Sequence, residues 1–311
     1  MDAPTDLAPS PKRIRLSPSR AKDFVQCPKL FHYKVIEGRT TPPTIATARG
    51  TLTHAVLERI FDLPHEQRQT PDAALGLLEP CWQIMVDPFI ERGSIPEDSL
   101  AAFARDACDG WIGDLEPDSY DAMRRIASAA GYRELAPEGS DAEAAIMGEA
   151  TEMVTNYFRV ERPWNFDPED RELKLFVDID EVPTIGYIDR LDRYLTSDQE
   201  ERWVISDYKT GKVPQARYLD ESFFAMRLYA LMLAEQVDIV PYSLRLIFVG
   251  AAPDEAIKPM RVDAAMLADT RSELRSIWSQ IASAQATDTW EPKKQRLCDW
   301  CDFQTECPAW T

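Results

Sequence analysis

The sequence contains no run of apolar residues long enough to cross a bilayer. Its N-terminus, rich in proline, serine and basic residues, lacks the hydrophobic segment of a secretory signal. These absences argue against a membrane-spanning or secreted protein, and we expect a cytoplasmic protein that binds no membrane. The motif Gly-x4-Gly-Lys-Ser/Thr is also missing, because the pair Gly211-Lys212 is followed by Val213. An ATP-driven motor is therefore not expected in this chain, and any helicase partner would be a separate protein.

Basic residues are too few to balance the acidic ones: 35 Lys and Arg face 53 Asp and Glu, for a net charge of -18. Such a balance argues against nucleic-acid binding, because phosphate neutralisation needs Lys and Arg. The distribution reduces this objection, since basic residues dominate 12–39 and recur at 293–296, while acidic residues concentrate between about 87 and 181. We predict a polarised molecule whose two ends form one basic surface. The alternative is a pair of solvated basic tails that bind no ligand.

The chain is long enough to bury a substantial core as one domain with an insert. Residues 1–15 are predicted to be a disordered tail, followed by a single domain over 16–311. Within that domain, a helical pattern interrupted by prolines predicts a helical insert at 64–158. A short cysteine-containing segment occupies 290–311. No internal repeat is found.

Apolar alternation predicts strands, and longer apolar periodicity predicts helices, in an order typical of a mixed central sheet with flanking helices. The predicted fold class is thus α/β, of the α+β kind. Strands are expected from about 172 to 179 and at 185–194, 203–209 and 242–249, and helices at 219–236 and 262–284.

Two helix starts are predicted near the N-terminus. Ser17 followed by Pro18 is typical of an N-cap with proline in the first turn. One face of the helix that follows is expected to carry Phe24, Cys27 and Phe31. Further along, Thr53 is predicted to cap a helix that runs to about 63, which places His54 at its start.

The most informative pattern is a pair of aspartates followed by a lysine. Asp189 and Asp207 interrupt consecutive apolar segments, and the polar turn at 196–200 suits two adjacent antiparallel strands. Period-two alternation puts Lys209 on the same face as Asp207. Two carboxylates can hold a divalent cation, and an amine beside them can orient or deprotonate a water, as metal-assisted phosphodiester hydrolysis requires. The alternative for an isolated Asp-x-Lys is a surface ion pair, but unpaired charges inside apolar strands would be costly without a metal.

His54 is one of three histidines in the chain and lies in the segment Gly-Thr-Leu-Thr-His-Ala-Val-Leu-Glu. A single histidine is more often a structural residue than a ligand, but this context favours a place in the metal site. Glu58, one helical turn later, is a candidate to support that site, with an ordinary surface glutamate as the alternative.

Six cysteines in a chain expected in the cytoplasm argue against a disulfide framework. The spacing C-x2-C-x5-C beside the C-terminus is formed by Cys298, Cys301 and Cys307. Cys27 is the natural fourth ligand, since it precedes a proline as Cys307 does. The set fits an iron–sulfur cluster or zinc, the alternative being reduced thiols without metal. Cys81 and Cys108 are expected to be ordinary buried thiols.

In combination these motifs resemble the RecB-type branch of the PD-(D/E)XK nucleases that carry a four-cysteine iron–sulfur cluster. The same branch includes the nuclease of CRISPR adaptation and the nuclease domains of AddAB-type recombination enzymes. The resemblance covers residues 16–60 and about 170–311. It rests on five ordered motifs: Leu-Ser-Pro-Ser…Phe-x-x-Cys-Pro-x-x-Phe at 16–31, Gly50…His54, Gly186-Tyr-Ile-Asp189, Asp207-Tyr-Lys209-Thr-Gly, and the three terminal cysteines.

The resemblance implies a restriction-endonuclease-like core and a 4Fe-4S cluster that joins the N- and C-terminal segments. The implied ligands of Mg²⁺ or Mn²⁺ are His54, Asp189, Asp207 and the backbone carbonyl of Tyr208. Lys209 would position or activate the attacking water. Tyr229 matches the tyrosine of the family's Gln-x-x-x-Tyr helix, but Ala225 stands where the glutamine would be. Glu172 falls near a glutamate that the family often carries before its first core strand.

These observations favour a metal-dependent DNA nuclease, an exonuclease on single strands or DNA ends in repair or recombination. The main alternative is a nuclease-fold DNA-binding subunit of a larger complex that cleaves weakly or not at all, which the acidic charge and Ala225 favour. An iron–sulfur redox carrier is a third hypothesis, but no flavin or nicotinamide site is recognisable.

Overall fold

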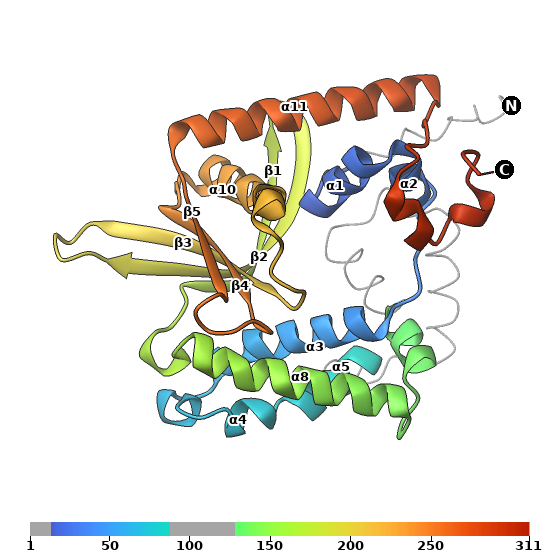
Figure 1. Cartoon of the computed structure of the whole chain (residues 1–311). Helices are drawn as coiled ribbons and strands as arrows, with labels where there is room; N and C mark the ends of the chain where they lie inside the picture. The colour runs from blue at the N-terminus through green and yellow to red at the C-terminus, as the bar shows by residue number, and fades with distance from the viewer. Residues whose placement is uncertain (1–13, 88–127, 311) are drawn as a thin grey trace, which may run out of the picture.

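The computed structural model describes residues 14–87 and 128–310, which form a mixed five-stranded sheet with helices on both faces (Figure 1). The strands are β1 (Asp170–Ile179), β2 (Val182–Leu195), β3 (Glu201–Lys209), β4 (Ser243–Phe248) and β5 (Ile257–Arg261). They lie side by side in sequence order, and β3 and β4 are parallel while the other neighbours are antiparallel. The predicted fold class is therefore confirmed.

Helices cover the sheet in two groups (Figure 1). One face is covered by α1 (Pro18–Gln26), α10 (Phe224–Val237) and α11 (Ala264–Thr287). The other carries α3 (Ile45–Arg59), α4 (Asp72–Leu75), α5 (Leu78–Val86) and α8 (Asp141–Val160). Short helices α2 (Pro28–Phe31) and α9 (Leu219–Ser222) precede longer elements. Among the described residues, no helix is both long and apolar enough to span a membrane.

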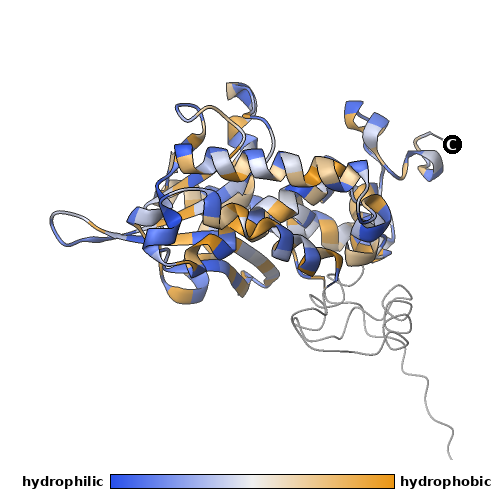
Figure 2. Cartoon of the chain, turned by 90° about the horizontal axis from the view of Figure 1, so that it is seen from below, coloured by the Kyte–Doolittle hydropathy of each residue, from blue (hydrophilic) through white to orange (hydrophobic). Residues whose placement is uncertain are grey.

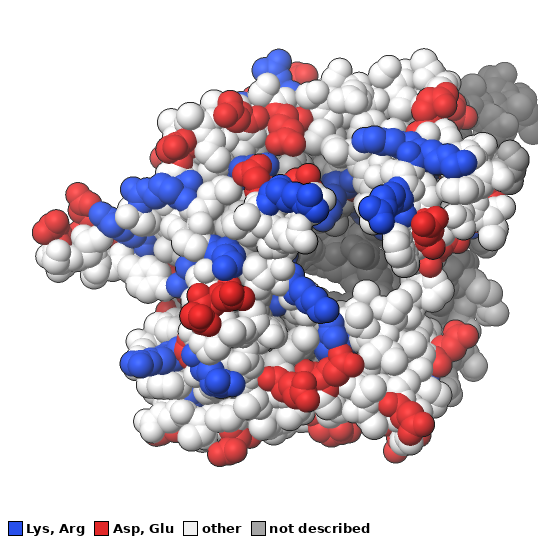
Figure 3. Space-filling model, viewed as in Figure 1, with Lys and Arg blue, Asp and Glu red and all other residues white. Residues whose placement is uncertain are grey.

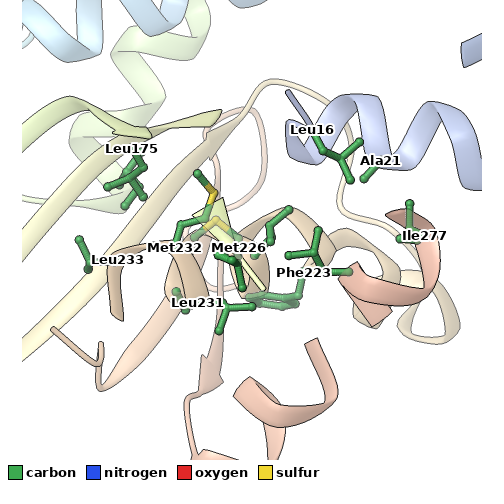
Figure 4. Packing of buried hydrophobic residues seen from close by; sticks show 14 of the residues in the cluster. Leu16, Ala21, Leu175, Phe223, Met226, Leu231, Met232, Leu233 and Ile277 are labelled. Carbon is green, nitrogen blue, oxygen red and sulfur yellow. The ribbon is translucent and has the colours of Figure 1, made fainter. Parts of the chain in front are cut away.

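Strict alternation along the central strands divides the interior into two cores. On β3, Ile205 packs towards α10 whereas Tyr208 packs towards α8, and on β4 Leu246 and Ile247 divide in the same way. Figure 4 shows the α10-side core, where Met226 and Phe223 lie among leucines near Leu16 and Ile277. In Figure 2 hydrophobic and hydrophilic residues alternate along the helices, as expected for helices with one buried face.

The start of α3 corrects the prediction for this region. The helix begins at Ile45, where Thr44 caps it through a reciprocal pair of hydrogen bonds with Thr47. Thr53 is not a cap but a buried residue of the third turn, and its hydroxyl donates to the carbonyl of Arg49 at 2.9 Å. A mid-helix threonine can satisfy its hydroxyl in this way, so threonine alone did not identify the cap.

The predicted N-cap at Ser17 is confirmed, since its side chain accepts from the N–H of Arg20 at 3.2 Å. The helix does not continue through Cys27, which is extended (φ -163°, ψ 113°) between α1 and α2. Pro28 explains the break, because a residue before proline avoids the helical region. The rings of Phe24 and Phe31 nevertheless meet edge to face at 5.5 Å.

Four predicted strands and both later helices are present, with shifted bounds. The segment predicted as one helix over 219–236 divides into α9 and α10 around Phe223, which is buried. Strand β5 was not predicted. Within 64–158 the described parts are largely helical, while 88–127, including Cys108, lie outside the described residues; Cys81 is buried as expected.

Candidate active site

Asp189 and Asp207 lie on the adjacent antiparallel strands β2 and β3, joined by the turn at 196–200 as predicted. The register pairs Arg190 with Ser206, so the two aspartates are the next residues along and share a face. The backbone N–H of Tyr208 donates to Oδ2 of Asp189 at 2.8 Å. The side chains of Asp189 and Asp207 are only 15% and 10% exposed, so both carboxylates are largely shielded from solvent.

His54 and Glu172 meet Asp189 at one point. Ligand atoms of these three residues lie within 4.8 Å of one another, and no other such group of three or more His, Cys, Asp or Glu occurs among the residues that the structure describes. His54 comes from the middle of α3, and its Nδ1 lies 3.3 Å from Oδ2 of Asp189. Gly50 lets this helix approach β3, because a Cβ there would lie 3.0 Å from the hydroxyl of Thr210. The arrangement could hold one divalent cation.

Glu172 occupies an irregular position on β1. Its φ of 47° is in the left-handed region, which is unusual for a residue with a Cβ. It stands opposite Asp189, where the ladder between β1 and β2 is interrupted. Loss of hydration in the site and then repulsion from Asp189, Glu58 and Asp207 raise the pKa of Glu172 to about 8. The residue as a whole is exposed, so its carboxyl group lies at the open side of the group that His54 and Asp189 form with it.

The other carboxyl groups of the site show the same crowding. Burial raises the pKa of Asp189, and the nearby Asp207 adds to this, while His54 opposes it. Glu58, one turn after His54, is close enough to affect Glu172. Four carboxyl groups therefore lie near one imidazole, a set that favours binding of a divalent cation over the metal-free state.

Asp207 and Lys209 lie on the same face of β3, as their spacing predicts, and they form an ion pair with Nζ of Lys209 2.6 Å from Oδ2 of Asp207. Burial alone would lower the pKa of Lys209, but the Asp207 carboxylate outweighs it and the pKa is raised. Apart from this ion pair, Oδ2 of Asp207 accepts no hydrogen bond within the described part of the chain, although it is buried. A buried carboxylate oxygen with so few partners fits a site for a cation.

Tyr229 of α10 lies against β2 at the edge of the site. Gly186 makes this possible, because a Cβ at that position would be 2.6 Å from a ring carbon of Tyr229. Burial, and then the charges of Asp207 and Asp189, raise the pKa of the Tyr229 phenol, so it remains a neutral hydrogen-bonding group. Ala225 lies one helical turn earlier and offers no polar group.

The four predicted cluster cysteines line one cavity, between α1–α2 and the C-terminal segment. Backbone N–H groups of Lys293 and Gln295 point at the sulfurs of Cys27 (3.3 Å) and Cys298 (3.4 Å). Burial, followed by repulsion from the three other thiols, raises the pKa of Cys301, and a backbone hydrogen bond from Phe303 opposes this. The five cysteines that the structure describes form no disulfide.

One group of residues near the site was missed in the sequence. Arg190, Asp192, Glu161 and Arg245 are brought together behind the two aspartates. The available signal was the presence of Arg190 and Asp192 inside an apolar strand segment, since buried charges need partners.

The face seen in Figure 3 is hollowed above α3 and below α1 and α2. Lys and Arg side chains lie along the rim of this hollow, with Asp and Glu spread over the same face. The face therefore has local positive charge despite the acidic balance of the whole chain.

Two aspartates and a lysine on neighbouring strands of a mixed sheet suit metal-assisted phosphodiester hydrolysis, because the carboxylates can bind a cation and the amine can orient a water. A family model described as the PD-(D/E)XK nuclease superfamily matches residues 15–308, and the chain belongs to this superfamily.

Among curated proteins none matches the sequence. The solved structures with similarity include a Eubacterium rectale protein assigned as an exonuclease, with 10% identity, a TM-score of 0.44, and coverage of 95% of this chain and 88% of that one. Another is SSO0001, with 17% identity, a TM-score of 0.34, and coverage of 71% and 99%.

Proposed function

We propose that this nuclease-superfamily protein is a metal-dependent deoxyribonuclease of the RecB-type branch, an exonuclease on single-stranded DNA or DNA ends in repair or recombination. The observation that carries the proposal is the convergence of His54, Glu172 and Asp189 within 4.8 Å, beside the ion pair of Asp207 and Lys209. The Lys and Arg side chains around the hollow of Figure 3 would attract the phosphate backbone.

The residues present fit Mg²⁺ or Mn²⁺. Carboxylate oxygens suit both ions, an imidazole is tolerated by Mn²⁺, and the buried Oδ2 of Asp207 accepts no hydrogen bond in the described chain beyond its ion pair with Lys209. In our proposal His54, Asp189 and Asp207 bind the cation, with the carbonyl of Tyr208, and Glu172 and Glu58 support them. When bound, the cation supplies charge stabilisation for the phosphorane-like transition state and lowers the pKa of water.

Lys209 has a more restricted role than an amine base. Because Asp207 raises its pKa, it remains an ammonium ion at neutral pH in the metal-free chain. An ammonium ion donates hydrogen bonds but accepts no proton. We therefore propose that Lys209 orients the attacking water and stabilises charge on the phosphate oxygens, while Tyr229 contacts the substrate or supports the site.

End-labelled single- and double-stranded DNA, incubated with the protein and Mn²⁺ or Mg²⁺, tests the function. Asp207→Asn and Lys209→Met should each lower the cleavage rate by about 100-fold or more. The matched controls are Asp198→Asn in the β2–β3 turn and Lys212→Met in the exposed loop after β3, which should cleave like the wild type. The position of the label gives the polarity of degradation.

Two outcomes would contradict the proposal. If cleavage does not need a metal, or if Asp207→Asn still cleaves DNA, the candidate site does not catalyse the reaction. DNA binding without cleavage by the metal-loaded wild type would instead support the alternative of a DNA-binding subunit, which needs a separate partner protein for catalysis.

We further propose that Cys27, Cys298, Cys301 and Cys307 hold a 4Fe-4S cluster, with zinc as the alternative. Backbone N–H groups directed at three of the sulfurs are the kind of contact that stabilises metal-bound thiolates. In the described chain, no three of these sulfurs lie within 4.8 Å of one another. This spacing is wider than the roughly 3.8 Å between two sulfurs of a zinc–thiolate tetrahedron, which favours the cluster over zinc. Lys29, Lys293 and Lys294 line the same cavity and suit an anionic cluster.

A further inference from the structure

A buried polar network lies directly behind the candidate metal site. Successive residues of a strand face opposite sides of a sheet, so Arg190 points away from the side that carries Asp189. The register places Arg190 opposite Ser206, and Ser206 opposite Arg245, in one row across β2, β3 and β4. This row is covered by Tyr157 of helix α8 and by Glu161, the residue that follows the helix.

Arg190 is the centre of the network and is fully buried. Its Nε lies 3.0 Å from the Asp192 carboxylate, and its two terminal nitrogens bind Glu161 at 2.7 and 3.1 Å. Nη1 also donates to the hydroxyls of Tyr208 at 2.7 Å and Tyr157 at 3.1 Å. The planar guanidinium therefore fixes β2, β3 and α8 relative to one another, which a flexible ammonium group could not do.

The charges in this network balance. Arg245 is the second cation, and its Nη2 lies 3.1 Å from Asp192 and 3.3 Å from Glu161, so two arginines face two carboxylates. A buried ion pair of this kind adds little net stability compared with apolar packing, since desolvation offsets the attraction. A purely structural role thus explains poorly why three charged residues are buried here beside the partly buried Arg245.

Tyr208 connects the network to the metal site. Its hydroxyl is held by Arg190, while its backbone N–H, on the same residue, donates to Oδ2 of Asp189 at 2.8 Å. Its ring also meets His54 edge to face, with centroids 6.0 Å apart. Two of the three converging ligands are therefore in contact with a residue whose far end is fixed by Arg190.

We propose that Arg190 is a positioning residue that fixes Tyr208, so that Asp189 and His54 are held in the orientation that receives the cation. This inference rests on the proposed function of the site. In this proposal the charged residues of the network raise the affinity for the metal, although none of them is a ligand of the ion. Partners of metal ligands commonly change affinity by 10–100-fold when they are altered.

The chain offers a matched pair of variants. Tyr208→Phe and Tyr157→Phe each remove one buried hydroxyl bonded to the same nitrogen of Arg190, but Tyr157 belongs to α8, which carries none of the proposed ligands. Mn²⁺ affinity would be measured by electron paramagnetic resonance without DNA, and Tm in EDTA would report stability. We expect similar decreases in Tm, about tenfold weaker Mn²⁺ binding for Tyr208→Phe, and affinity within about twofold of wild type for Tyr157→Phe.

Arg190→Lys is a second test, because it keeps the positive charge but loses the planar guanidinium and its fixed set of donors. It should also weaken Mn²⁺ binding about tenfold, in a protein whose Tm in EDTA shows that it is folded. Two results would overturn the positioning role of Arg190: equal Mn²⁺ affinities in the wild type and Tyr208→Phe, or equal losses of Mn²⁺ affinity in both tyrosine variants. Neither result would contradict the proposed nuclease function. A wild type that binds no Mn²⁺ would instead contradict the proposed metal site, and this inference with it.

Discussion

At the scale of single residues, the carboxyl groups of the site repel one another, and Glu172 shows the largest effect. Its pKa of about 8 lies above the ordinary value of 4.5, because lost hydration and the neighbouring Asp189, Glu58 and Asp207 disfavour its ionised form. At pH values between about 4.5 and 8, the Glu172 carboxyl is ionised in the unfolded chain but keeps its proton in the folded chain. The free energy of unfolding without metal should therefore decrease as pH rises from about 4.5 to 8, and a bound cation should reverse that loss.

We predict that Glu172→Gln makes the metal-free protein less sensitive to pH. Between pH 5.5 and 8.5 the wild type should lose about 1 kcal/mol more than the variant, a modest value because solvent screens an exposed side chain. Denaturant unfolding in EDTA at both pH values measures the difference. Glu152→Gln, on an exposed position of α8, is the control and should behave like the wild type. If Glu172→Gln retains the full pH dependence, repulsion at this residue is not its source.

The same residue marks a limit of what the sequence could predict. Asp189, Asp207 and Lys209 were identified as site candidates from their residue types and spacing, His54 from its sequence context and Glu172 from the family resemblance alone, and the structure brings these residues together. The place of Glu172 depends on a left-handed backbone opposite Asp189, which no local pattern of side chains encodes. Arg190 and its partners come from β2, β4 and α8, so their contacts exist only in the folded chain.

At the scale of elements, the packing of α10 on β2 depends on one missing side chain. Gly186→Ala would place a Cβ 2.6 Å from the Tyr229 ring, a contact that real Cβ atoms do not make. We predict that this variant loses about 1–3 kcal/mol of stability through overpacking. Gly148→Ala in α8 is the matched control, because nothing lies within 4 Å of its new Cβ, and it should gain about 0.5–1 kcal/mol.

A double-mutant cycle with Tyr229→Ala identifies the cause. Removing the ring should relieve the overlap, so Gly186→Ala should be far less destabilising in the Tyr229→Ala background. Chemical denaturation of the four proteins provides the coupling energy. Additive losses would mean that Gly186 is required for its backbone and not for the space it leaves to Tyr229.

Elements were easier to predict than their ends. The period-two pattern of β3 and the apolar face of α10 were sufficient for both elements, since each buries a continuous face. The start of α3 was misplaced because Thr44 and Thr53 are equally good caps by residue type, and only the structure shows the reciprocal hydrogen bonds of Thr44 with Thr47. Strand β5 was missed because Pro259 lies within it, which is tolerated at the edge of a sheet.

At the scale of the whole molecule, the two ends of the chain are joined beside the cysteines. The side chain of Gln295 donates to the carbonyl of Gln26 at 2.8 Å, and Tyr33 donates to the carbonyl of Glu306 at 3.3 Å. Trp290 stacks on Phe31 at 5.8 Å. These contacts close the chain without a metal, so a bound cluster would reinforce an existing junction. They also bring the described basic residues of 14–39 and those of 293–296 into one region.

A cluster held by all four cysteines would close a loop of roughly 270 residues. In the chain-entropy model a crosslink of this span stabilises a fold by on the order of 5 kcal/mol, an upper value here because hydrogen bonds already join the segments. We therefore predict that Cys27→Ala, purified without oxygen, loses its bound metal and shows a clearly lower Tm than the wild type. Cys81→Ala, in the separate α8-side core, should lower the stability but keep the bound metal. Elemental analysis and thermal unfolding of the wild type and both variants test this prediction. Iron together with sulfide would support the cluster, whereas zinc would mean that the cysteines bind zinc in its place. A wild type that contains neither metal would contradict the crosslink.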